Sequence, residues 1–183
     1  MKELIYNQTQ IPKEQWRYGL RSSSATGCGW IATYNALKLM GYHMDPEKII
    51  RRYERMLPLL HGTTGTVAFA PAACFRKWGF PVELIFARNR FDECVRQADA
   101  CILFYYWRNR FKVGAHFVAL HHTDQGFIGY NTYKTSDGPD FYGDSLEAFL
   151  KIRGFFGTVL LTIRDKRKKK SSKQWLSGFL LFA

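Results

Sequence analysis

The sequence lacks the segments that mark several large classes of protein. No apolar run approaches the length needed to span a bilayer. The start, Met1-Lys2-Glu3 followed by polar residues, lacks the apolar core of a secretory signal. There is no internal repeat and no Gly/Ser-rich linker. We therefore expect a cytoplasmic protein with a single domain over residues 1–163 and a C-terminal tail over residues 164–183.

Cysteine is scarce and is not arranged for metal binding. No pair has CxxC spacing and no Cys/His cluster has zinc-finger spacing, so a structural metal is not expected. The loop over residues 62–66 has neither the spacing nor the lysine of a phosphate-binding loop. In a reducing compartment all four thiols stay free. The four are Cys28, Cys74, Cys94 and Cys101, and we expect the last three to be core residues.

Acidic residues are also few, 15 against 27 lysines and arginines, giving a net charge of +12. Residues 164–173 contain seven basic residues and one acidic residue and so supply six of those charges, which leaves only weak support for nucleic-acid binding. The basic run at 166–170 precedes an apolar segment at 175–182. Such a tail could bind an anionic membrane surface or a protein partner. We favour the simpler alternative, in which the charge run is solvated and the terminus packs on its own domain or a neighbour.

Helix signals dominate the first half and strand signals the second. We predict a buried helix from Cys28 to Met40, a capped helix from Asp45 and a third helix ending near Gly79. Residues 11–24 look irregular. Strands are predicted at 82–87, 100–107, 115–122, 126–132 and 156–163, with short helices at 91–98 and from 144 or 145. This is an α+β pattern, with N-terminal helices packed on a C-terminal antiparallel sheet.

Cys28 lies where the first predicted helix begins, between Gly27 and Gly29. The positive end of the helix dipole there favours a thiolate, and the free first-turn amides can bind an oxyanion. The flanking glycines leave room for a substrate carbonyl. The alternative is a small buried residue at a helix start, and by itself Cys28 does not decide between the two.

His116 and Asn131 lie on two predicted strands that form a hairpin. A turn at Thr123-Asp124 places them directly opposite each other, and a turn at Asp124-Gln125 makes them diagonal neighbours on one face. In either register the Asn131 side chain can reach the imidazole. A nucleophilic cysteine needs such a base and a third group to orient it, so the order Cys28, His116, Asn131 predicts a catalytic triad.

Three strings around these residues resemble the bacterial bacteriocin-processing C39-like branch of the papain-like cysteine peptidases. They are Thr26-Gly27-Cys28-Gly29-Trp30, residues 114–120 (GAHFVAL) and residues 126–131 (GFIGYN). The resemblance covers about residues 15–163. It implies a papain-like fold and thiol-dependent cleavage of a peptide or amide bond, without a metal or an organic cofactor.

The sequence departs from that family at one position. The family has a glutamine about six residues before its cysteine, which donates to the oxyanion, and Ser22 stands there instead. Gln15 and the Ser22 hydroxyl are the candidate replacements, and losing such a donor costs on the order of 10²–10³ in turnover. An active hydrolase of amides or esters, an acyltransferase at the same site, and a catalytically weak or inactive binding module therefore all stay open.

Overall fold

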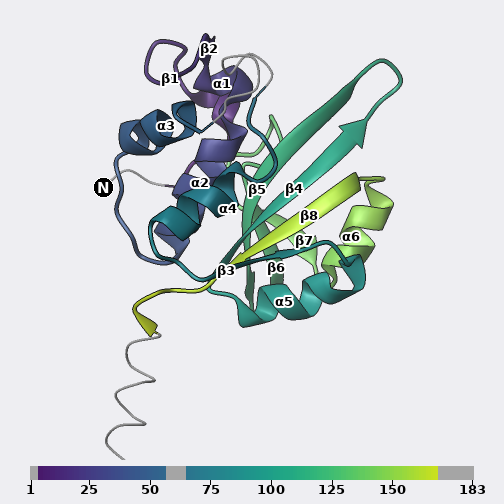
Figure 1. The fold of residues 1–183 in the computed structure, drawn as a ribbon. Coiled ribbons are helices and arrows are strands. Elements are labelled where there is room, and N and C mark those ends of the chain that lie inside the picture. The colour runs from purple at the N-terminus through teal and green to yellow at the C-terminus, as the bar shows by residue number, and fades with distance from the viewer. Residues whose placement is uncertain (1–3, 57–64, 169–183) are drawn as a thin grey trace, which may run out of the picture.

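The computed structural model describes residues 4–56 and 65–168 of the 183-residue chain (Figure 1). Helices α1 to α4 lie on one face of a six-stranded sheet, and α5 and α6 lie on the other. This confirms the predicted α+β class. The helices are α1 Ser23–Thr26, α2 Cys28–Leu39, α3 Pro46–Glu54, α4 Ala70–Lys77, α5 Phe91–Gln97 and α6 Leu146–Ile152, with short 3-10 turns at Gln8–Gln10 and Arg88–Arg90.

The sheet is antiparallel throughout, in the order β3-β8-β4-β5-β6-β7. Its strands are β3 Val82–Ile85, β4 Ala100–Arg108, β5 Val113–Thr123, β6 Gly126–Tyr130, β7 Asp140–Gly143 and β8 Phe156–Ile163. The strand β7 was not predicted. Residues 11–24, expected to be irregular, contain the two-residue strands β1 (Arg17–Tyr18) and β2 (Arg21–Ser22) and the start of α1.

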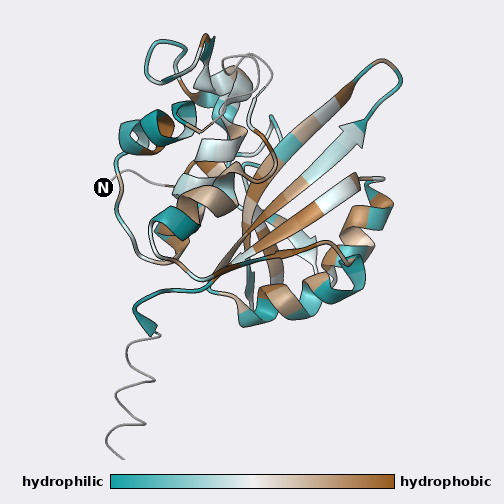
Figure 2. Ribbon diagram, viewed as in Figure 1, coloured by the Kyte–Doolittle hydropathy of each residue, from teal (hydrophilic) through white to brown (hydrophobic). Residues whose placement is uncertain are grey.

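The sheet separates two hydrophobic clusters, because side chains alternate between its faces. Along β4, Ile102 and Phe104 pack with α2, α3 and α4, whereas Leu103 and Tyr105 pack with α5 and α6. Figure 2 shows the apolar colouring concentrated on the strands and on the inner sides of the helices. The domain therefore holds one sheet between two helical layers.

Helix α2 is buried along most of its length, as predicted. Every residue from Cys28 to Leu37 is buried, so its polar side chains need internal partners. Thr33 hydrogen-bonds to the Tyr53 hydroxyl. Asn35 accepts from the Ile5 amide (2.9 Å) and donates to the Ile5 carbonyl (2.8 Å). The N-terminal segment is thereby fixed along α2, which brings residue 8 toward the nucleophile end of that helix.

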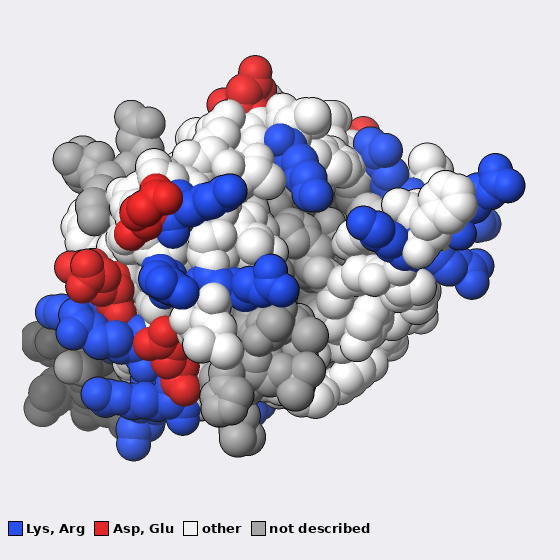
Figure 3. Space-filling model, turned by 90° about the horizontal axis from the view of Figure 1, so that it is seen from above, with Lys and Arg blue, Asp and Glu red and all other residues white. Residues whose placement is uncertain are grey.

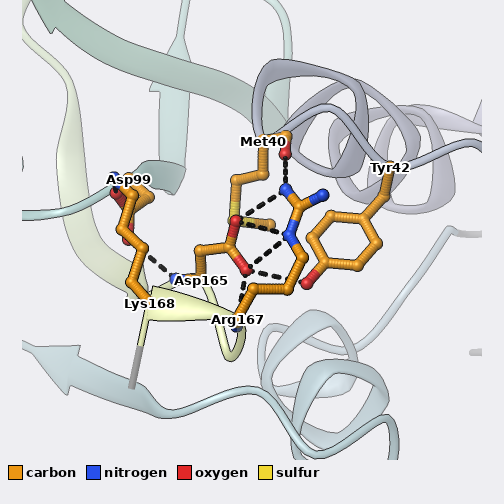
Figure 4. A network of polar contacts seen from close by, with 6 residues as sticks. All are labelled: Met40, Tyr42, Asp99, Asp165, Arg167 and Lys168. Carbon is orange, nitrogen blue, oxygen red and sulfur yellow. Dashed lines mark hydrogen bonds and ion pairs between the residues drawn. The ribbon is translucent and has the colours of Figure 1, made fainter. Parts of the chain in front are cut away.

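The first residues beyond β8 are bonded to the C-terminal end of α2 (Figure 4). The buried Asp165 carboxylate accepts from the Tyr42 hydroxyl (2.7 Å) and from the Arg167 guanidinium (2.7 Å). Arg167 also donates to the Met40 carbonyl, and Lys168 pairs with Asp99. We call the contacts of Asp165 with Tyr42 and Arg167 the C-terminal clasp. Residues 169–183, which include most of the predicted basic and apolar tail, lie outside the described residues.

Asp165→Asn is expected to lower the free energy of unfolding at neutral pH by about 2 kcal/mol, because it removes a buried charged acceptor from several donors. The hydrogen bonds from Arg167 hold the Asp165 pKa well below its ordinary 3.8. Because the Asp165 pKa is lower in the folded chain than in the unfolded chain, the ionised carboxylate stabilises the fold. The difference in the free energy of unfolding between wild type and Asp165→Asn should therefore shrink as the pH falls below about 4 and Asp165 is protonated. Urea unfolding at several pH values measures it. The exposed Asp124 supplies the control Asp124→Asn, and equal effects of the two variants would contradict the role of the clasp.

Within the described residues, no helix combines the length and the apolar character that crossing a bilayer requires.

Candidate active site

One cavity of about 510 Å³ brings together the three residues predicted to form a triad. Its wall includes Cys28, His116 and Asn131, together with Gln8, Tyr105 and Trp107. The cysteine comes from the start of α2, the histidine from β5, and the asparagine from the residue after β6. Residues far apart in the sequence thus share one cavity, although no hydrogen bond joins the thiol to the imidazole in the described chain.

The β5–β6 hairpin has the second of the two registers considered from the sequence. Thr123 pairs with Gly126, so Asp124 and Gln125 form the turn. The pairing ends at Ala119 and Tyr130, and the strands diverge beyond that point. The Phe117 backbone lies close enough to the Cys28 sulfur to act to lower the thiol pKa. The nucleophile thus lies where the two strands separate.

The Cys28 thiol is neutral at rest. The residue is only 9% exposed, and this burial raises the thiol pKa from an ordinary 9.0 to about 11. The nearby backbone of Phe117, Gly29 and Cys28 itself acts in the opposite direction but does not outweigh burial. The sequence predicted a thiolate favoured by the helix dipole. Burial is the stronger effect here, because removing a charge from water costs more than a helix terminus returns.

The two glycines beside Cys28 are required by packing rather than by space for a substrate. A Cβ at Gly27 would lie 2.5 Å from the Ser23 carbonyl oxygen and 2.7 Å from the Trp30 indole nitrogen. A Cβ at Gly29 would lie 2.8 Å from the Thr66 hydroxyl oxygen. These distances are too short for any side chain, so the glycines let α2 pack closely against its neighbours.

His116 is oriented by the backbone of Asn131, not by its side chain. The imidazole Nε2 lies 2.6 Å from the Asn131 carbonyl oxygen. A carbonyl only accepts hydrogen bonds, so the proton of the neutral ring resides on Nε2 and the Nδ1 lone pair is free to act as a base. Burial lowers the His116 pKa, an effect that the Asn131 carbonyl partly offsets, which keeps the resting ring neutral.

Asn131 adopts a left-handed backbone conformation, with φ of 66°. Asparagine tolerates this region better than most residues, and the conformation turns the carbonyl toward His116. Its side chain turns instead to the N-terminal segment. Its Oδ1 accepts from the main-chain N–H of Gln8 (2.8 Å), and its Nδ2 donates to the side-chain carbonyl of Gln8 (3.1 Å). The prediction that the Asn131 side chain orients His116 is therefore wrong, and the main-chain carbonyl of Asn131 makes that contact instead.

Gln8 is the residue of the site that sequence reasoning missed. Its Nε2 donates to the carbonyl of Ser24 in α1 (3.2 Å), four residues before Cys28, and its Oε1 accepts from Asn131. One hydrogen on Nε2 has no partner among the described residues and is available to a group in the cavity. Gln8 lies 20 positions before Cys28, much farther than the family spacing, so distance along the chain gave no signal for it.

The two oxyanion candidates proposed from the sequence do not reach the cavity. Gln15 is exposed, and its amide closes a turn with the Pro12 carbonyl. The Ser22 hydroxyl pairs with Ser24 at 2.8 Å, just before α1. Neither residue lines the cavity wall. Ser22 is held in the small β1–β2 hairpin, where it pairs with Arg17, and Gln15 lies in the turn before that hairpin.

The other cysteines occupy different surroundings. Cys74 and Cys101 are buried, and burial raises both of their pKa values, that of Cys74 to about 12. Cys94 is half-buried. Within the described residues, no group of three or more His, Cys, Asp or Glu side chains is placed to hold a metal ion.

Alkylation of Cys28 by iodoacetamide, without substrate, is expected to keep accelerating to above pH 10, because the reactive thiolate forms only near the raised pKa. Peptide mass mapping against pH measures the rate at each cysteine, with half-buried Cys94 as the internal reference. His116→Ala should leave the profile unchanged. A plateau below pH 7 that disappears in His116→Ala would instead demonstrate a resting thiolate–imidazolium pair.

No protein-family model matches the sequence, and a search of curated proteins finds no match. Among solved structures, the chain is similar to the peptidase domain of Streptococcus ComA, described as a bi-functional ABC transporter involved in a quorum-sensing pathway. The match has a TM-score of 0.48 and 17% sequence identity, and it covers 75% of this chain and 92% of the other. One solved structure to which this chain is similar is thus a peptidase domain.

Proposed function

We propose that the protein is a cysteine hydrolase that cleaves a peptide or amide bond through a papain-like Cys-His-Asn site. The observation that carries the proposal is the hydrogen bond from His116 Nε2 to the Asn131 carbonyl, beside a cavity shared with Cys28. That bond fixes the tautomer of the neutral imidazole and leaves Nδ1 unprotonated, so Nδ1 can act as the base. A thiol and an oriented base in one cavity are the minimum for thiol-dependent acyl transfer.

The resting groups are neutral, so proton transfer accompanies attack. As the Cys28 sulfur bonds to the substrate carbonyl carbon, its proton moves to His116 Nδ1, and the carbonyl oxygen becomes an oxyanion. The imidazolium then gives that proton to the departing amine, leaving a thioester on Cys28. Water attacks the thioester, His116 takes its proton, and the carboxylic acid and free thiol are regenerated. An amine in place of water would give acyl transfer from the same intermediate.

The oxyanion is bound by hydrogen-bond donors at the start of α2. The free N–H of the Gln8 side chain is one donor, and the Cys28 amide, predicted from its place at a helix start, is the other. Gln8 therefore takes the role that the sequence assigned to Ser22 or Gln15. Because Gln8 is also tied to Asn131, the oxyanion donor and the group that orients the base move together.

The second candidate is a binding module that uses the same cavity without turnover. The raised Cys28 pKa favours it, since a thiol that stays protonated is a poor nucleophile unless a base assists. Nucleic-acid binding has no comparable support beyond the net charge.

Digestion of a random peptide library, read by mass spectrometry, distinguishes the two candidates. A hydrolase gives new peptide termini with wild type and none with Cys28→Ala, and acid-quenched wild type carries an acyl mass on Cys28. Peptides that bind to both forms and are cut by neither would identify a binding module.

A further inference from the structure

The wall of the cavity beside Cys28 carries positive charge. Its wall includes Lys134 and Arg153 and contains no aspartate or glutamate. In Figure 3, lysines and arginines stand on both sides of a hollow in the upper face, and the acidic side chains in view lie toward the left and upper edges. A cavity with this distribution of charge attracts an anionic group.

Arg153 is held in place without a carboxylate partner. It caps the end of α6, and its guanidinium lies over the rings of Tyr133 (5.1 Å) and Phe149 (5.8 Å). The four ion pairs within the described residues involve other cations. A guanidinium that none of these ion pairs uses can bind a carboxylate through two hydrogen bonds.

The Tyr133 hydroxyl belongs with Arg153, because the guanidinium is close enough to act to lower the Tyr133 pKa, and the ring of Tyr133 lines the cavity. Apart from that cation the hydroxyl has no hydrogen-bond partner among the described residues. A phenol beside a guanidinium forms a polar pair that suits a carboxylate. Asp140 is close enough to act on Tyr133 electrostatically, but its carboxylate accepts from the Ser136 hydroxyl (2.7 Å) and is not part of the wall.

Aromatic rings make part of the cavity wall apolar. Tyr105 stacks on Phe155 at 4.1 Å between ring centroids, and both line the cavity. Tyr105 also meets the His116 ring edge-on at 5.9 Å. Tyr105 and Phe155 therefore give the wall that holds Arg153 an apolar surface beside His116, which fits an apolar substrate group.

We infer that the substrate is a carboxylate-bearing peptide whose carboxylate binds the Arg153 guanidinium, which Tyr133 positions, with an apolar side chain against Tyr105 and Phe155. This inference rests on the proposed function for the cavity's role, but it concerns binding and not cleavage. The carboxylate is that of a glutamate or aspartate side chain or that of a peptide C-terminus.

The test measures binding to the full chain carrying Cys28→Ala, so that no turnover intervenes. The probes are coumarin-labelled Ala/Phe peptides in which one position at a time is Glu, matched to a set with Gln, each with a free or an amidated C-terminus. Fluorescence anisotropy gives the dissociation constants. At the preferred position Glu should bind about tenfold more tightly than Gln, in keeping with a charge-assisted hydrogen bond. If amidation rather than the Gln exchange weakens binding, the source is the C-terminal carboxylate.

In the Cys28→Ala chain, a second substitution Arg153→Gln should remove the preference for Glu over Gln, and Tyr133→Phe should reduce it. Arg55→Gln is the matched control, since Arg55 is also an exposed arginine that caps a helix, on α3, and is outside the cavity wall. Salt of about 0.5 M should shrink the preference in the parent chain, which tests the inference even if Arg153→Gln does not fold. Equal affinities for all matched peptides, or a preference that survives Arg153→Gln, would overturn it. A carboxylate preference without cleavage by wild type would contradict the proposed hydrolase and leave this inference standing.

Discussion

Cys28→Ala and His116→Ala are each expected to reduce kcat by at least about 10⁴, the scale at which the members of a triad act as one unit. Without Cys28 no thioester forms, and without His116 nothing removes the proton from a thiol whose pKa is about 11. Because the two act in one step, the double variant should be no slower than either single variant. Initial rates on a peptide from the library digestion measure all three.

His122→Ala is the matched control for the histidine. It lies on the same strand, with its ring against Phe127 at 5.0 Å, and is not part of the cavity wall. We expect wild-type turnover from this variant. Retention of cleavage by Cys28→Ala, or equal losses from His122→Ala and His116→Ala, would be incompatible with the proposed site.

Gln8→Ala is expected to lower kcat by about 10²–10³ with little change in KM, because an oxyanion donor acts on the transition state and not on the bound substrate. Gln8→Glu is the sharper variant. Glutamate still accepts from Asn131 Nδ2 but cannot donate to the oxyanion, so it keeps that contact with Asn131 while losing the rate.

Gln10→Ala controls for the position of Gln8. Gln10 belongs to the same short 3-10 turn but is exposed, so it should leave kcat unchanged. Steady-state kinetics and thermal unfolding are read together. If Gln8→Glu kept full kcat, Gln8 would be a structural residue and the oxyanion would be bound by other groups.

Strand and helix patterns predicted the frame of the site, because those patterns are set by local burial. The nucleophile helix ends at Leu39, just before Gly41 with its φ of 76°, and β8 has the predicted bounds 156–163. The hairpin that carries His116 followed from alternation and a two-residue turn. These features depend on neighbours a few residues away, which a sequence displays directly.

The parts that could not be predicted depend on long-range contacts. The local sequence does not indicate that β6 ends before Asn131. It therefore could not predict that His116 bonds to the main-chain carbonyl of Asn131 and not to its side chain. Gln8 reaches the site because Asn35 fixes the N-terminal segment along α2. The Cys28 pKa likewise depends on how many distant residues cover the sulfur, whereas the helix dipole is visible from sequence alone.

The dispersal of the site along the chain has a consequence for biosynthesis. Cys28 and Gln8 leave the ribosome early, but the strand that supplies His116 and the corner at Asn131 emerge only after most of the domain has been made. The Phe117 backbone, which acts to lower the thiol pKa, is made together with them. A nascent or truncated polypeptide that ends before β5 therefore contains the Cys28 thiol without the His116 imidazole, and the two come to share one cavity only when the domain has closed around α2.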